Sequence, residues 1–186
     1  MKQSFLMAAA LTAILLSAGC GGKTTPAAGS LPDIDAVTGA TGFAVKTATP
    51  DREAGRKVVA EFLKESKVYN FASVENNKPR VRPLGIFLEH DGKIWFHIGK
   101  HKAGFAQIQV NPNVEIVSVN DKGDWIRLSG KAVTVNNPEL DEAVFNHSPG
   151  LRKMYNAETG HTLGHFYIAD GTAEISRGNT VELYRF

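Results

Sequence analysis

Short apolar runs separated by turn residues dominate the chain beyond residue 66. Apolar and polar positions alternate within these runs, which is typical of half-buried strands. Extended segments are predicted at residues 68–75, 80–89, 93–98, 114–120, 125–135, 163–169, 172–176 and 181–186. Asn76-Asn77-Lys78, His90-Asp91-Gly92 and Asp121-Lys122-Gly123 lie between neighbouring segments and are rich in residues that tolerate positive φ. The pattern therefore predicts antiparallel hairpins.

Helical patterns precede and interrupt these strands. Thr49-Pro50 has the chemistry of a helix start, and apolar residues then recur at helical spacing up to Ser66. A short helix is expected at 102–109, and a pair of helices between 138 and 156 with Asn137-Pro138 and Ser148-Pro149 as start signals. This order predicts a mainly β (α+β) fold, in which an antiparallel, closed or partly closed barrel carries peripheral helices.

The first twenty residues have the pattern of an export signal. Lys2 is followed by an apolar stretch from Phe5 to Leu16 and by small residues that lead to Cys20. The stretch is shorter than the about 20 residues of a membrane-spanning helix, so cleavage is expected rather than insertion. The segment resembles a bacterial lipoprotein signal, which implies removal of residues 1–19, lipidation of Cys20 and anchoring on the extracytoplasmic side of a bacterial membrane. An ordinary secretory signal is the alternative.

Residues 20–50 are rich in Gly, Ala, Thr and Pro and predict a flexible tether before a single folded domain at 51–186. Within the tether, the stretch DAVTGAT (35–41) resembles the sequence recognised by a flavin transferase. The resemblance implies FMN attached to Thr41 through a phosphoester bond. A plain spacer of small residues is the alternative.

Composition excludes several classes of function. The 21 basic and 19 acidic residues give a net charge of +2, so a nucleic-acid partner is not indicated. Cys20 is the only cysteine, so residues 51–186 have no internal disulfide and no thiol chemistry. Signatures of Ser-His-Asp hydrolases, phosphate-binding glycine loops and paired zinc cysteines are also missing from the sequence. Redox chemistry would therefore need a bound cofactor.

Several weak motifs in a fixed order point to one family. They are FASVENNKPRVRP (71–83), GKIWF (92–96), Lys102, NPNV (111–114) and WIRLSGKA (125–132). Over roughly residues 54–186 the chain resembles the pyridoxamine 5′-phosphate oxidase-like superfamily. The resemblance implies an FMN-binding split β-barrel and a homodimer with two flavin sites at the subunit interface. Residues 181–186 lack the arginine-rich tail of the true oxidase, so pyridoxamine phosphate oxidation is the activity least expected.

The resemblance also implies where the flavin binds. Its cofactor-binding positions correspond to Arg82, Pro83, Leu84, His97, Lys100, His101, Lys102 and Trp125. The backbone at 82–84 would face the ring system, and the basic stretch at 97–102 would meet the phosphate, with Lys102 matching the family's phosphate-binding lysine. Cationic side chains and free backbone N–H groups suit a dianion. A solvated turn is the alternative for this stretch, and core packing is the alternative for Trp125.

Two histidine pairs at a spacing of four, His97 with His101 and His161 with His165, raise the question of a metal site. This spacing brings two ligands to one face only on a helix. Gly99 and Gly164, beside extended patterns, argue against a helix at both places. No metal site is therefore predicted.

Two functions follow from these expectations. The favoured one is an extracytoplasmic, membrane-anchored FMN-dependent oxidoreductase that reduces a small molecule or passes electrons onward, with an unknown donor and acceptor. Its FMN would be noncovalent in the barrel, covalent at Thr41, or both. Thirteen residues separate Thr41 from Ala54 and reach up to about 45 Å, enough for docking in the same barrel or that of a dimer partner. The alternative is a non-catalytic module that holds flavin or haem.

Overall fold

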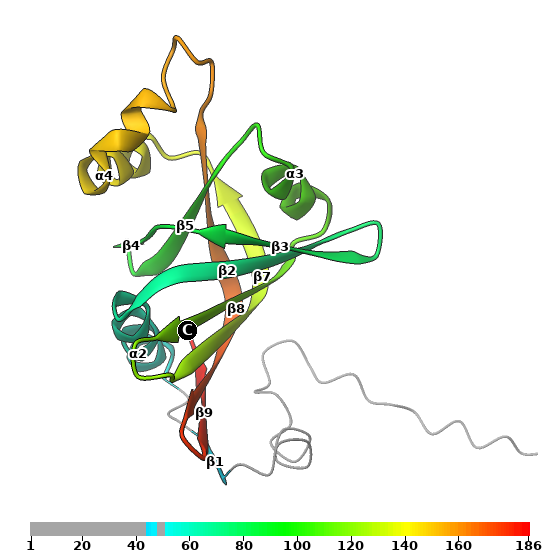
Figure 1. Cartoon of the computed structure of the whole chain (residues 1–186), viewed down its shortest axis with the longest axis vertical. Helices are drawn as coiled ribbons and strands as arrows, with labels where there is room; N and C mark the ends of the chain where they lie inside the picture. The colour runs from blue at the N-terminus through cyan, green and yellow to red at the C-terminus, as the bar shows by residue number, and fades with distance from the viewer. Residues whose placement is uncertain (1–43, 48–50) are drawn as a thin grey trace, which may run out of the picture.

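The computed structural model of the chain describes residues 44–47 and 51–186 (Figure 1). Cys20, Thr41 and the signal at 1–19 lie outside these residues. The elements are β1 (Ala44–Thr47), α2 (Arg52–Lys64), β2 (Ser66–Glu75), β3 (Lys78–Leu84), β4 (Phe87–His90), β5 (Lys93–Gly99), α3 (Ala103–Val110), β6 (Asn113–Asn120), β7 (Trp125–Val135), α4 (Pro138–His147), a 3-10 helix η1 (Pro149–Lys153), β8 (Leu163–Arg177) and β9 (Thr180–Arg185).

The strands form one strongly bent sheet with the order β1-β9-β8-β7-β6-β2-β3. The long strand β8 pairs with β7 along most of its length, with β5 at its start and with β9 at its end. Strand β5 also pairs with β4, so β8 joins the two parts of the sheet. All these pairs are antiparallel except that of β1 with β9. The predicted antiparallel split barrel with peripheral helices is confirmed.

Three phenylalanines fill the interior where the sheet folds onto itself. Phe71 of β2, Phe96 of β5 and Phe166 of β8 are all fully buried. The ring centroid of Phe166 lies 5.3 Å from that of Phe71 and 5.7 Å from that of Phe96. Burying an aromatic side chain of this size stabilises the folded state by about 2–3 kcal/mol, so this cluster holds the two parts of the sheet together.

Helix α2 packs against β2, β5 and β9. Its N-cap is Asp51, whose carboxylate accepts a hydrogen bond from the backbone N–H of Glu53 at 2.9 Å, so the helix does not begin at the predicted Thr49-Pro50. The apolar face of α2 is buried against the sheet. Gly55 faces the last strand so closely that a Cβ there would overlap the backbone carbonyl of Arg185.

The observed strands differ from the predicted ones in three places. The segment predicted at 80–89 is two strands, because Leu84 pairs with β2 whereas Phe87, beyond Gly85, pairs with β5. The segments at 163–169 and 172–176 are one strand, which bends where Asp170 takes a φ of 51° and the register with β7 shifts. Strand β1 lies within the range predicted as tether and adds to the edge of β9.

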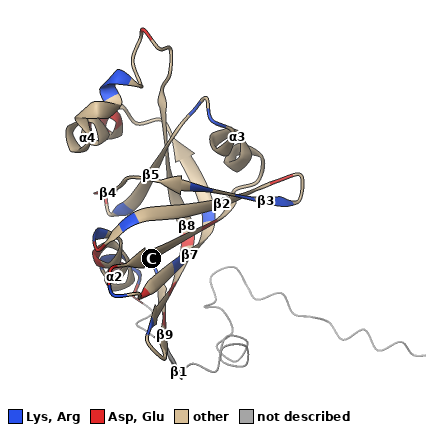
Figure 2. Ribbon diagram, in the orientation of Figure 1, with Lys and Arg blue, Asp and Glu red and all other residues tan. Residues whose placement is uncertain are grey.

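The hairpin turns are as predicted, with positive φ at Asn76, Asn77, Asp91, Gly92 and Gly123. Figure 2 shows basic and acidic residues interspersed over the drawn elements rather than gathered on one side. Among residues 44–47 and 51–186, none of the helices has the length and apolar character needed to cross a membrane.

Replacing Gly55 by alanine tests the close contact of α2 with β9. We expect Gly55→Ala to lower the free energy of unfolding by about 1–3 kcal/mol, because the added methyl group has no room beside the Arg185 carbonyl. Gly150→Ala is the matched control, since a Cβ at residue 150 meets nothing within 4 Å. Urea unfolding of both variants measures the difference, and equal stability would contradict the packing described for α2.

Candidate functional site

A cavity of about 420 Å³ lies between the end of β3, the end of β5 and the segment after α4. It is lined by Arg82, Pro83, Leu84, Gly85, Ile86, His97, Ile98, Gly99, Lys102, Leu151, Met154, Tyr155 and Leu163. Five of the eight predicted cofactor-binding residues are therefore brought together: Arg82, Pro83, Leu84, His97 and Lys102. Most of the other lining side chains are apolar, which is typical of a small-molecule site.

Strand β3 forms one wall of the cavity and is fixed to helix α3 through Arg82. The guanidinium donates to Ser73 Oγ at 3.0 Å and to Gln107 Oε1 at 2.6 Å. Gln107 in turn donates to Glu75 Oε1 at 3.1 Å. Since these bonds occupy both terminal nitrogens of Arg82, its role in the wall is to position β3 relative to α3.

The three basic residues at 100–102 point to three different surroundings. Lys102 lines the cavity and occupies the N-cap position of α3, so its charge adds to the positive end of that helix. Lys100 donates to Asn136 Oδ1 at 2.7 Å and lines a separate cavity of about 260 Å³. The His101 ring stacks on that of His161, with centroids 3.8 Å apart. Of these three, only Lys102 faces the 420 Å³ cavity.

His97 ends a chain of three hydrogen-bonded side chains behind the cavity. Its Nδ1 lies 2.8 Å from Nδ1 of His165, which is only 2% exposed. Nε2 of His165 lies 3.0 Å from Oδ1 of Asp141 on α4. His97 itself is 8% exposed, and within residues 51–186 its Nε2 has no hydrogen-bond partner. One ring nitrogen of a buried histidine is thus left available beside the cavity.

Burial keeps His97 and His165 neutral. Loss of hydration is the largest of three causes, with repulsion from His165 and His147, that together lower the pKa of His97 to about 3. Burial also lowers the pKa of His165, although the Asp141 carboxylate opposes this effect. An ionised Asp141 can only accept, so His165 carries its proton on Nε2, and its bare Nδ1 accepts from Nδ1 of His97. The geometry thereby leaves His97 with an unprotonated Nε2.

The four histidines noticed in the sequence at a spacing of four contact one another across the two strands, in different pairs, rather than along a helix. His97 lies opposite His165 in the antiparallel register of β5 with β8, and His101 meets His161 beyond the strand ends. In an antiparallel pair, a step forward along one strand matches a step backward along the other. The equal spacing of 97–101 and 161–165 is therefore the signal in the sequence that could have predicted this pairing. No cluster of three or more His, Cys, Asp or Glu suited to a metal ion occurs in the described part of the chain.

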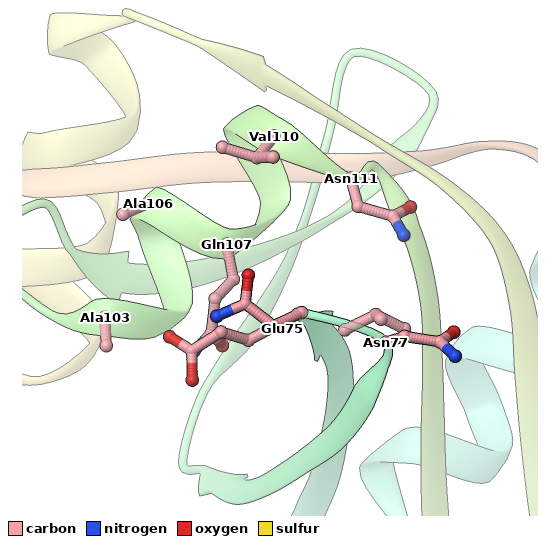
Figure 3. A pocket seen from close by; sticks show the side chains of 9 residues that line it. Glu75, Asn77, Ala103, Ala106, Gln107, Val110 and Asn111 are labelled. Atoms are coloured by element: carbon pink, nitrogen blue, oxygen red, sulfur yellow. The ribbon is translucent and has the colours of Figure 1, made fainter.

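A larger cavity, of about 630 Å³, lies between the β2–β3 turn and helix α3 (Figure 3). Figure 3 shows Glu75, Gln107 and Asn77 at this cavity, together with the apolar Val110 and Ala106. The Glu75 carboxylate is already paired with Arg80 at 2.8 Å and accepts from Gln107. None of the predicted cofactor-binding residues lines this cavity, so the smaller cavity is the better candidate site.

Trp125 lies away from both cavities. It begins β7, pairs with Val119 and Ser176, and has the Arg127 guanidinium over its ring at 5.2 Å. It does not line the 420 Å³ cavity, so a flavin contact from Trp125 within one chain stays a prediction that this cavity does not support.

Comparison with known proteins gives one family and one group of folds. The family model described as pyridoxamine 5′-phosphate oxidase matches residues 56–175. A search of curated proteins found no match. Among solved structures, a NimC/NimA family protein from Clostridium acetobutylicum is 34% identical, with a TM-score of 0.66 over 73% of this chain and 94% of that chain.

Two more distant structures share the fold. A protein of Clostridium acetobutylicum related to general stress protein 26, of the pyridoxinephosphate oxidase family, is 17% identical with a TM-score of 0.56 over 72% of this chain and 96% of its own. A heme-binding protein from Mycobacterium smegmatis is 13% identical with a TM-score of 0.53, over 73% of this chain and 58% of that chain. At such identities the likeness concerns the fold alone.

The pKa of His97 makes stability depend on pH. Between pH 6.5 and 3 the unfolded chain binds a proton at His97 that the folded chain does not, so this contribution is complete above pH 6.5 and is lost on acidification. We expect the free energy of unfolding to fall with pH below 6.5 more steeply in the unmodified chain than in His97→Gln, by up to about 1.4 kcal/mol per pH unit. Urea unfolding between pH 7 and 4.5 measures the slope. His161→Gln, at an exposed position, should keep it, and an unchanged slope in His97→Gln would contradict the burial of a neutral imidazole.

Proposed function

The chain belongs to the pyridoxamine 5′-phosphate oxidase family, and from this we propose that it is a redox protein that binds FMN in the 420 Å³ cavity. The observation that carries the proposal is that three features needed for flavin binding occur together in this cavity. The backbone of β3, the cation of Lys102 and a set of apolar walls converge on one space. A flavin needs donors and acceptors at its ring edge, a cation near its phosphate and apolar faces around the ring.

Strand β3 supports the ring-binding part of this proposal. It ends the strand order, and among the described strands it pairs only with β2. The backbone groups on its outer side therefore have no ladder partner, and such groups are rigid hydrogen-bonding partners for a heterocycle. Lys102, at the start of α3, suits the phosphate through charge and through the helix end.

When bound, FMN would supply the electron-transfer chemistry. The contribution of this chain is to hold the ring between β3 and the apolar residues Ile98, Leu151 and Leu163, and to limit water around it. In this proposal the protein is an oxidoreductase that reduces a small molecule or passes electrons onward, with donor and acceptor still to be found.

A haem-binding module without turnover is the second candidate. It is favoured by one observation, the bare Nε2 of His97 with Nδ1 held by His165, which is the form of histidine that ligates metals. The M. smegmatis protein of the same fold is described as heme-binding. Visible absorbance separates the two candidates, because the two cofactors have different spectra.

The same proposal includes assembly and location. A second copy of the chain would complete the flavin site as a homodimer, since at 420 Å³ the cavity of one chain is near the small end of the about 300–1,000 Å³ usual for ligand sites. Lipid on Cys20 would hold the protein on the extracytoplasmic side of a bacterial membrane. A flavin transferase would be needed to attach FMN to Thr41.

Strand β1 bears on the covalent flavin. Thr41 precedes Ala44 by three residues, so the two Cα atoms are within about 11 Å of each other. Ala44 pairs with Thr180 of β9, and Figure 1 shows β1 at the end of the molecule opposite α4 and apart from β3. We therefore favour, for a flavin on Thr41, either a second flavin or docking in the partner chain over docking in the cavity of its own chain.

Titration of the purified full chain with FMN tests noncovalent binding. We expect binding that quenches flavin fluorescence, and about tenfold to hundredfold weaker binding in Lys102→Ala, because a hydrogen bond to a charged group contributes about 1.5–3 kcal/mol. Lys100→Ala removes the same charge two residues away, outside the cavity, and should bind FMN nearly as the unmodified chain does. A chain that takes up no FMN would sink the proposal, and uptake of haem instead would favour the second candidate.

Intact mass of the exported chain tests both modifications at once. Co-expressed with a flavin transferase in a bacterium that processes lipoproteins, the mature chain is expected to begin at Cys20 with added lipid and to carry one FMN. Cys20→Ser should lose the lipid and leave the membrane fraction, and Thr41→Val should lose only the FMN. An unmodified Thr41 peptide under these conditions would contradict covalent attachment, and an unlipidated Cys20 would contradict the anchor.

A further inference from the structure

The side chains of Asp141, His165 and His97 form an unbroken hydrogen-bonded path from the surface to the candidate cavity. The Asp141 side chain is 40% exposed, whereas the side chain of His165 is 2% exposed. The two contacts of the path measure 3.0 Å and 2.8 Å, so both are within hydrogen-bonding distance. His97 lines the cavity at the inner end, and its Nε2 is the one nitrogen of the path without a partner among residues 51–186.

We propose that these three residues are a proton relay that makes His97 Nε2 the proton acceptor of the cavity, for a ligand that presents an O–H or N–H group. This deepens the proposed function and rests on it only for the identity of the site. His97 would touch the ligand, while His165 and Asp141 are positioning residues that fix the tautomer of His97.

The transfer balances without any further reactant. The O–H or N–H bond of the ligand breaks and its proton binds His97 Nε2. The proton on Nδ1 of His97 moves to Nδ1 of His165, and the proton on Nε2 of His165 moves to the Asp141 carboxylate. The ligand gains one negative charge, Asp141 loses one, and both histidines end neutral in the opposite tautomer. No imidazolium is left in the buried part of the path, where its desolvation would be costly.

Charged and titratable groups around the path disfavour an imidazolium within it. Lys102 lines the same cavity, and the electrostatic influence of His147 from α4 is felt at His97. Lys100, in the turn after β5, acts on His165 in the same sense. These groups disfavour a charged histidine, and Lys102 would stabilise the anion that the ligand becomes. The Asp141 carboxylate is the one acidic group in direct contact with the path in the described part of the chain.

The cavity selects a ligand by its donor. A carboxylate or phosphate would meet a nitrogen lone pair at Nε2 and gain nothing from it, whereas a phenol, alcohol, amide or imide would donate to it. Since His97 is buried, bulk water would not compete with the ligand for a hydrogen bond to this nitrogen.

Phenol and anisole test the donor requirement, because they share a ring and only phenol has an O–H group. The measured quantity is the ratio of the dissociation constant of anisole to that of phenol, from NMR titrations of the full chain without flavin. We expect this ratio to be about twofold to tenfold larger in the unmodified chain than in His97→Phe. A relative affinity that His97→Phe leaves unchanged would overturn the proposal.

Nitrogen NMR of ¹⁵N-histidine-labelled full chain tests the relay without any ligand. At neutral pH we expect His97 to be protonated on Nδ1 and bare on Nε2, and His165 to be protonated on Nε2. Asp141→Ala should mix the tautomers of both histidines, while Glu142→Gln, which removes a neighbouring charge on the same helix, should not. A proton on His97 Nε2 in the unmodified chain, or tautomers indifferent to Asp141→Ala, would overturn the relay.

FMN titration of the same samples separates the two levels of inference. If the chain binds FMN but His97→Phe does not change the affinity for phenol relative to anisole, the relay is refuted and the proposed function is left intact. A chain that shows the donor preference and the expected tautomers but binds no FMN supports the relay and refutes the proposed function.

Discussion

The pairing of β5 with β8 is the constraint on which the rest of the molecule depends. This single register sets Phe96 opposite Phe166 in the barrel interior and His97 opposite His165 on the other face. Strand β5 is buried from Ile94 to Gly99, so both faces are covered, one by the barrel core and one by the segment around α4 and η1. Because side chains alternate between faces, a slip of one residue would exchange core and cavity residues throughout the strand.

The buried histidines show how the fold accommodates polar groups in its interior. Two imidazoles in contact would be costly if either were charged, and burial lowers the pKa of both. Contact with each other and with Asp141 satisfies three of their four ring nitrogens. A buried polar atom without a partner is unfavourable by about 1–3 kcal/mol, so the fourth nitrogen, His97 Nε2, would be stabilised by a ligand that donates a hydrogen bond to it.

Much of the fold was accessible from sequence because alternation and turn chemistry are local signals. Strand β7 and the three Asn- or Gly-containing hairpin turns follow directly from such patterns. The division of 80–89 at Gly85 depends on a change of pairing partner, from β2 to β5, which no local pattern encodes. The N-cap of α2 is Asp51 rather than the predicted Thr49. Both residue types suit an N-cap, so the local pattern could not choose between them.

The candidate site was predictable only as far as the family resemblance reached. It marked Lys102 and the strand at 82–84, which line one cavity, but it could not separate Lys102 from Lys100, whose side chain turns to Asn136. The contact of His97 with His165 joins residues 68 positions apart, and Asp141 comes from a third element. Such a path exists only once the sheet has closed.

The excursion between β7 and β8 gives the molecule a separable part. These strands are antiparallel neighbours from Trp125↔Ser176 to Val135↔His165, and a tight turn would suffice to join them. Residues 136–162 instead form α4, which brings Asp141 to His165, and η1 with the following loop, which brings Tyr155 to the cavity. A different insert at this point would keep the sheet and β3 but line the cavity with other side chains, so the ligand preference of this cavity can change in one loop without redesign of the sheet.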